Sequence, residues 1–115
     1  MSLSINTRKE DGVVVMELSG RLTIGESVLS LRDSVRGLVD GGSLKFILNL
    51  GDVGYIDSSG LGELVSIYTT VKNKEGDVKL LNLSAKAKDL LQMTKLLTVF
   101  DTYEEEADAL AALKG

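Results

Sequence analysis

An almost uninterrupted apolar run from Leu44 to Leu50 limits the folds open to this chain more than any other feature. A strand that is apolar on both faces must be covered on both sides, as strands in the centre of a parallel sheet are. The segment from about Ser58 to Lys74 then carries apolar residues at helical spacing, and a strand-like run from Val78 to Leu83 follows it. This order of strand, helix and strand predicts two parallel strands joined by a right-handed crossover.

The N-terminal segment is typical of a β-hairpin. A weakly alternating run from Leu3 to Lys9 precedes Asp11-Gly12, and the apolar strand Val13 to Leu18 comes next. Asp-Gly between two such runs is a strong turn signal. Apolar residues at helical spacing then predict a helix from Glu26 to Val39, and Gly41-Gly42 is expected to supply its left-handed C-terminal cap.

The C-terminal part of the chain adds smaller elements. Ser84 is a good N-cap for a helix from Ala85 to Met93, Val99-Phe100 is expected to form a short edge strand, and a last helix is expected from Glu104 to Leu113. Together the patterns predict an α/β protein with a mixed sheet of four to five strands and about four helices. The sheet has a parallel centre and an antiparallel N-terminal hairpin. The 115 residues match the commonest domain size, so one domain over residues 1–115 is expected.

Composition argues against several classes of function. The formal net charge is −4 and the basic residues are scattered, so neither nucleic acid nor a membrane surface is an expected partner. The chain has no cysteine and no histidine, so thiolate and imidazole metal ligands are missing and no metal site is expected. The N-terminus lacks a basic segment before an apolar region, and no apolar run reaches roughly 18 residues, so we expect a cytoplasmic protein.

The most informative motif is Asp57-Ser58-Ser59-Gly60-Leu61-Gly62, which follows an apolar run and opens a helical pattern. This places it at the carboxyl end of a parallel strand, where such sheets bind ligands and partners. Asp and Ser are preferred N-caps, so one interpretation is purely structural. Each glycine, however, costs up to about 1 kcal/mol relative to alanine in a helix interior, and glycine also lets a partner approach the backbone. Leu61 is either an inward anchor or an exposed contact, and its spacing from Leu64 favours the inward role.

The serine hydroxyls suggest two chemistries. Ser58 as an enzyme nucleophile needs a base, but histidine is absent and neither a Gly-x-Ser-x-Gly nor a Ser-x-x-Lys pattern occurs. Ser58 as a phosphoacceptor fits better, because a helix N-terminus tolerates a phosphate of about −1.5 to −2 charges. A partner packed on the same spot would have to desolvate that charge beside Asp57. A penalty of around 3 kcal/mol weakens binding roughly a hundredfold.

The chain also resembles a known family. The strings Ile56-Asp57-Ser58-Ser59-Gly60-Leu61-Gly62, Leu48-Asn49-Leu50, Leu18-Ser19-Gly20-x-Leu22 and Leu80-Leu81-Asn82-Leu83-Ser84 are similar to STAS domains, and to bacterial anti-sigma factor antagonists in particular. The resemblance covers essentially the whole chain, and the Asp-Ser-Ser-Gly-Leu-Gly string is quite specific. It implies a protein that binds an anti-sigma factor, itself often a serine kinase using ATP, and thereby releases a sigma factor for transcription.

The resemblance implies roles for individual residues. Phosphorylation of Ser58 blocks binding of the anti-sigma factor and a serine phosphatase restores it, whereas Ser59 is the weaker acceptor candidate. Asp57 and Gly60 shape the phosphoacceptor site. ATP belongs to the kinase, so no cofactor and no catalytic residue is expected in this chain. The residues expected to contact the partner are Leu22, Thr23, Ile24, Ser59, Gly60, Leu61 and Gly62.

One position departs from the family pattern. Many members carry an acidic residue soon after Gly-x-Leu, where this chain has Thr23. Either Thr23 or Gly25 caps the first helix, or Thr23 contacts the partner.

Two other functions stay open. The chain is alternatively a STAS scaffold or accessory subunit of a stress-signalling assembly or of a lipid-transport ATPase. A nucleotide-binding module is a weaker candidate, because no Gly-x-x-x-x-Gly-Lys-Ser/Thr loop is present.

Overall fold

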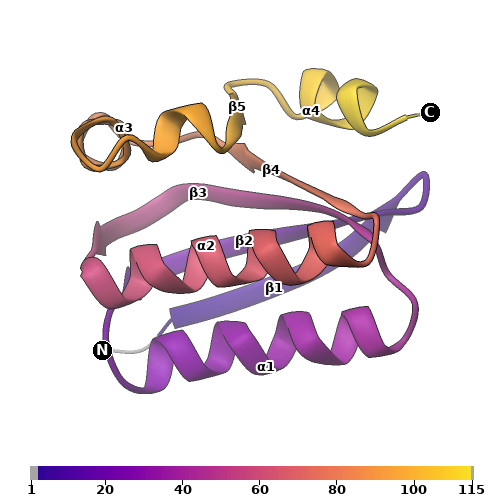
Figure 1. The fold of residues 1–115 in the computed structure, drawn as a ribbon, viewed down its shortest axis with the longest axis horizontal. Helices are drawn as coiled ribbons and strands as arrows, with labels where there is room; N and C mark the ends of the chain where they lie inside the picture. Colours follow the sequence, from indigo (N-terminus) through magenta and orange to yellow (C-terminus); the bar gives the residue numbers. More distant parts are fainter. Residues whose placement is uncertain (1–2, 115) are drawn as a thin grey trace.

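The computed structural model describes residues 3–114 and arranges them as one five-stranded sheet with helices on both faces (Figure 1). The strands are β1 (Leu3–Glu10), β2 (Val13–Leu22), β3 (Lys45–Ile56), β4 (Asp77–Leu81) and β5 (Asp101–Tyr103). The helices are α1 (Glu26–Asp40), α2 (Ser58–Asn73), α3 (Ala85–Met93) and α4 (Glu106–Leu113), with a 3₁₀ turn η1 (Leu96–Thr98) before β5. The predicted α/β class is confirmed.

The strands lie side by side in the order β1-β2-β3-β4-β5. β1 and β2 are antiparallel, with Glu10 opposite Val13 across the turn, and all other neighbours are parallel. Both turn residues, Asp11 at φ 52° and Gly12 at φ 81°, adopt the positive φ that a tight hairpin turn needs. β3 is therefore the central strand, as its apolar run predicts.

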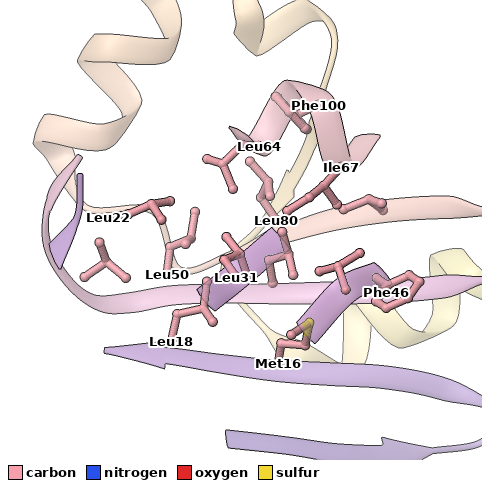
Figure 2. Packing of buried hydrophobic residues seen from close by; sticks show 14 of the residues in the cluster. Met16, Leu18, Leu22, Leu31, Phe46, Leu50, Leu64, Ile67, Leu80 and Phe100 are labelled. Atoms are coloured by element: carbon pink, nitrogen blue, oxygen red, sulfur yellow. The ribbon is translucent and has the colours of Figure 1, made fainter. Parts of the chain in front are cut away.

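Two clusters of apolar side chains cover the two faces of the sheet. The larger one packs α1 and α2 against the sheet, and Figure 2 shows Met16, Leu18, Phe46 and Leu80 from the strands meeting Leu31 of α1. The smaller one joins α4 to the opposite face, on the far side of the strands from α1 in Figure 1. Its members are Val13, Val15, Ile47, Leu81, Ala109 and Leu113. Burial on both faces accounts for the near-continuous apolar sequence of β3.

Several boundaries differ from the sequence prediction. The edge strand expected at Val99-Phe100 is wrong, because Phe100 is buried in the larger cluster with its ring edge-on to Tyr68 at 5.2 Å, and the edge strand β5 begins one residue later. The last helix starts at Glu106 rather than Glu104. The expected left-handed conformation after α1 is confined to Gly42, at φ 103°.

β2 and β3 both extend beyond the ranges expected from their apolar runs and remain paired up to Leu22 opposite Ile56. Because the chain enters α1 soon after β2 and α2 directly after β3, both helix N-termini lie at the same end of the sheet, at the left of Figure 1. The Asp57–Gly62 motif lies at this end.

Candidate functional site

Ser58 is the first residue of α2 and is exposed, directly after the carboxyl end of β3. The loop between β2 and α1, residues 23–25, lies next to it, because Ile24 is hydrogen-bonded to Asp57. The Ile24 side chain lies at the surface and is 76% exposed. An exposed hydroxyl and an exposed apolar side chain therefore share one end of the sheet.

Asp57 connects the two loops of the site. Its Oδ1 accepts a hydrogen bond from the Gly60 N–H at 2.8 Å and so caps α2, and its Oδ2 accepts one from the Ile24 N–H at 2.9 Å. Its own N–H donates to the Leu22 carbonyl at 3.2 Å. The structural interpretation of Asp57 as an N-cap is thus correct, and the same carboxylate also fixes the loop that carries Ile24.

These bonds predict a pH dependence. The Ile24 N–H, then the Gly60 N–H, favour the charged form and hold the pKa of the Asp57 carboxyl below its usual value. A depressed pKa contributes stability that is present above about pH 4 and is lost as the pH falls through the folded-state value. Asp57→Asn keeps one acceptor oxygen, and we expect its unfolding midpoint to be lower than that of the natural protein at pH 7. The difference should shrink in urea titrations repeated towards pH 3, and a constant difference would contradict this role.

Gly60 is glycine for a reason internal to the fold. A Cβ at this position would lie 2.2 Å from the Leu22 carbonyl oxygen and 2.9 Å from the Leu22 Cγ. The first turn of α2 therefore packs directly on the end of β2. A Cβ at Gly62, by contrast, would meet nothing within 4 Å.

Three of the residues expected to contact a partner need correction. The side chain of Leu22 is fully buried, Leu61 is 7% exposed, and Gly60 faces Leu22. All three residues lie in the buried contact between α2 and β2, beneath the exposed residues of the site. Leu61 has the inward role that its helical spacing favoured. The expected partner residues that remain at the surface are Thr23, Ile24, Ser59 and Gly62, with Thr23 and Ser59 half-buried.

The loop before α1 is fixed by Ser27, which sequence reasoning missed. The Ser27 hydroxyl accepts a hydrogen bond from the Thr23 N–H at 2.9 Å and donates one to the Thr23 carbonyl at 2.7 Å. Gly25 occupies the N-cap position and no side chain caps α1, so the expectation of a Gly25 cap is confirmed and that of a Thr23 cap is wrong.

Four further residues near the motif were also missed. Arg32 of α1 pairs with Glu63 of α2, and Tyr55, which is half-exposed near the end of β3, lies under the Arg21 guanidinium at 5.2 Å from the ring centroid. An acidic residue at an inward position of α2 was a signal for the Glu63 pair, since buried carboxylates are normally paired.

Within residues 3–114, His, Cys, Asp and Glu side chains form no group of three or more that could hold a metal ion. None of the helices in this part of the chain combines the length and the apolar character needed to cross a bilayer. The arrangement offers an exposed hydroxyl at Ser58, a fixed carboxylate at Asp57 and an exposed apolar side chain at Ile24.

Comparison with known proteins assigns the chain to a family. The family model for the STAS domain matches residues 4–109, and the chain belongs to this family. Within it, the chain is similar to the anti-sigma F factor antagonist of Paenibacillus polymyxa, with 29% identity over 99% of this chain and 97% of that protein.

Solved structures show the same fold. A crystal structure from Thermotoga maritima superposes with a TM-score of 0.89 at 25% identity, covering 95% of this chain and 93% of that one. The Bacillus cell fate determinant SpoIIAA in its phosphorylated form superposes with a TM-score of 0.76 at 21% identity, over 96% of this chain and all of that one.

Proposed function

We propose that this protein is an anti-sigma factor antagonist whose binding to its partner is switched off by phosphorylation of Ser58. The observation that carries the proposal is the exposed Ser58 hydroxyl at the N-terminus of α2, beside a loop that presents Ile24 to solvent. The names of the similar proteins support the partner class, because the Paenibacillus polymyxa relative is an antagonist of an anti-sigma factor.

The local structure accommodates a phosphate without refolding. Ser58 is exposed and begins the helix, where backbone N–H groups and the helix dipole favour negative charge. The neighbouring Asp57 carboxylate is already fixed by hydrogen bonds from Ile24 and Gly60. A phosphoryl group therefore changes the charge of the surface and leaves the arrangement of the two loops in place.

The same change is unfavourable for a bound partner. A protein packed over Ser58 would have to desolvate a phosphate of about −1.5 to −2 charges next to the Asp57 carboxylate. The switch then acts directly at the interface and needs no conformational change in this chain. In this scheme the protein is a substrate and a binding partner, not an enzyme, and the kinase supplies the ATP.

The regulatory cycle has three proteins. An anti-sigma factor with serine kinase activity transfers the γ-phosphoryl group of ATP to the Ser58 oxygen, with loss of the hydroxyl proton and release of ADP. A serine phosphatase hydrolyses the ester and restores binding. That SpoIIAA, which has the same fold, has been solved in a phosphorylated form agrees with this cycle.

Phosphate transfer tests the acceptor assignment. The anti-sigma factor isolated with this protein from its source cells is incubated with Mg²⁺-ATP and with the natural protein, Ser58→Ala or Ser59→Ala. Intact-mass spectrometry is expected to show one added phosphate on the natural protein and on Ser59→Ala, and none on Ser58→Ala. Equal phosphorylation of Ser58→Ala would rule out Ser58 as the acceptor.

A further inference from the structure

A groove of about 430 Å³ runs between α1 and α2 and starts at Ser59, the residue after the proposed phosphoacceptor. Val28 and Leu29 of α1 supply apolar lining, and Leu29 is 51% exposed. Across from them lies the α2 surface around Gly62, where no Cβ narrows the groove. The full lining is Ile24, Gly25, Val28, Leu29, Arg32, Ser59, Gly62, Glu63 and Ser66.

A charged pair forms part of the lining. The Arg32 Nε and Nη2 atoms both donate to Glu63 Oε1, at 3.0 and 2.8 Å. The two ends of the pair differ in exposure, because the Glu63 side chain is 2% exposed and that of Arg32 is 39% exposed. The carboxylate is thus held inside the protein, while the guanidinium reaches the open groove.

Arg32 keeps unused hydrogen-bonding capacity. A guanidinium has five N–H donors, and only its Nε and Nη2 atoms bond to Glu63. Its Nη1 atom has no hydrogen-bond partner among residues 3–114 in the structure. The Arg32 guanidinium is planar, is held in place by Glu63 and has free N–H donors. This geometry suits binding of a second carboxylate. Arg32 is also the only basic residue among the lining residues.

We propose that this groove binds a segment of the partner protein that presents a carboxylate to Arg32 and apolar side chains to Val28 and Leu29. The inference rests on the proposed function and specifies the chemistry of its partner. Glu63 acts as a positioning residue that holds the guanidinium in the groove. Arg32 then selects partners that carry an acidic residue at the matching position.

The location of Arg32 also places the groove beside the proposed phosphorylation site. Glu63 lies one helical turn after Ser59, so the Arg32 guanidinium is close to the N-terminus of α2. The groove therefore begins next to Ser58, and one segment of a partner can cover both.

Two variants that differ only at Arg32 distinguish a role in partner binding from a purely structural link between α1 and α2. Glu63→Gln removes the buried carboxylate but leaves Arg32 charged, with an amide oxygen as acceptor. The double variant Arg32→Gln and Glu63→Gln differs only at Arg32 and keeps a neutral pair that can hydrogen-bond. Arg36→Gln on the same helix changes net charge outside the groove lining. Urea unfolding of each variant shows that the fold is intact before binding is measured.

Binding to the isolated anti-sigma factor is then measured by titration calorimetry, with Ser58→Asp included. We expect Arg36→Gln to bind as tightly as the natural protein and Glu63→Gln to bind a fewfold more weakly, because a neutral amide holds the guanidinium less firmly. The double variant is expected to bind about tenfold or more weakly than Glu63→Gln. The salt dependence should also be shallower for the double variant.

Two results would overturn the inference. Binding by the folded double variant as tight as that of Glu63→Gln would mean that Arg32 has no role, and a loss of affinity in Arg36→Gln as large as that in the double variant would mean that only net charge counts. If Ser58→Asp loses affinity in either case, the proposed switch stands although the groove assignment fails. If no variant, including Ser58→Asp, changes binding, the proposed function fails as well.

Discussion

Gly60→Ala is expected to lower the free energy of unfolding by about 3 kcal/mol, the range found for overpacked interiors. The added methyl group would lie 2.2 Å from the Leu22 carbonyl oxygen, which is backbone and has no rotamer by which to move away. The first turn of α2 must therefore shift from β2. That shift strains the hydrogen bond from the Asp57 N–H to Leu22 and, through Asp57, the position of Ile24.

Gly62→Ala is the matched control for this prediction. The two glycines lie in the first turns of the same helix, but a Cβ at Gly62 meets nothing within 4 Å. Alanine is the better helix former, so this variant is expected to be as stable as the natural protein or up to about 1 kcal/mol more stable. Urea unfolding of both variants measures the difference. Equal stability of the two variants would contradict the packing of α2 on Leu22.

Ser58→Asp is expected to weaken binding to the anti-sigma factor roughly a hundredfold, equivalent to about 3 kcal/mol. A carboxylate at this exposed position adds one negative charge beside Asp57, and a docked partner must desolvate both. The free energy of unfolding should change by less than about 0.5 kcal/mol, as for an exposed residue at a helix N-terminus.

Ser58→Ala serves as the neutral comparison and should bind within a fewfold of the natural protein. Calorimetric titration of both variants against the same partner measures the two affinities. Retention of full affinity by Ser58→Asp would argue against charge as the cause of release. A large loss in Ser58→Ala would instead mean that the hydroxyl itself is part of the interface.

The order and type of the elements could be predicted from the sequence because each has a strong local pattern. The hairpin follows from Asp11-Gly12, and the central position of β3 from its apolar run, which only two covered faces explain. The edge strand was misplaced because Phe100 has a high strand propensity but fills a space beside Tyr68. Packing against a distant residue overrode the local preference.

In the candidate site, too, local sequence predicts some features, and others depend on how distant elements pack. Asp57 could be identified as the helix cap because it directly precedes the helical pattern, and Ser58 lies exposed after it, while its role as acceptor stays a prediction. The contact between Gly60 and Leu22 depends on how closely α2 approaches β2, and the pair of Arg32 and Glu63 depends on how α1 packs against α2. Neither distance is encoded in a local pattern. Leu22 was consequently expected at the surface although it lies beneath the site.

In the proposed switch, a phosphate on Ser58 separates this protein from its anti-sigma factor. The most direct test uses one preparation, fully phosphorylated at Ser58 as shown by mass spectrometry, and titrates it with the partner before and after treatment with a serine phosphatase. We expect the phosphorylated protein to bind at least a hundredfold more weakly and the treated protein to regain the original affinity. Equal affinities before and after dephosphorylation would contradict the claim.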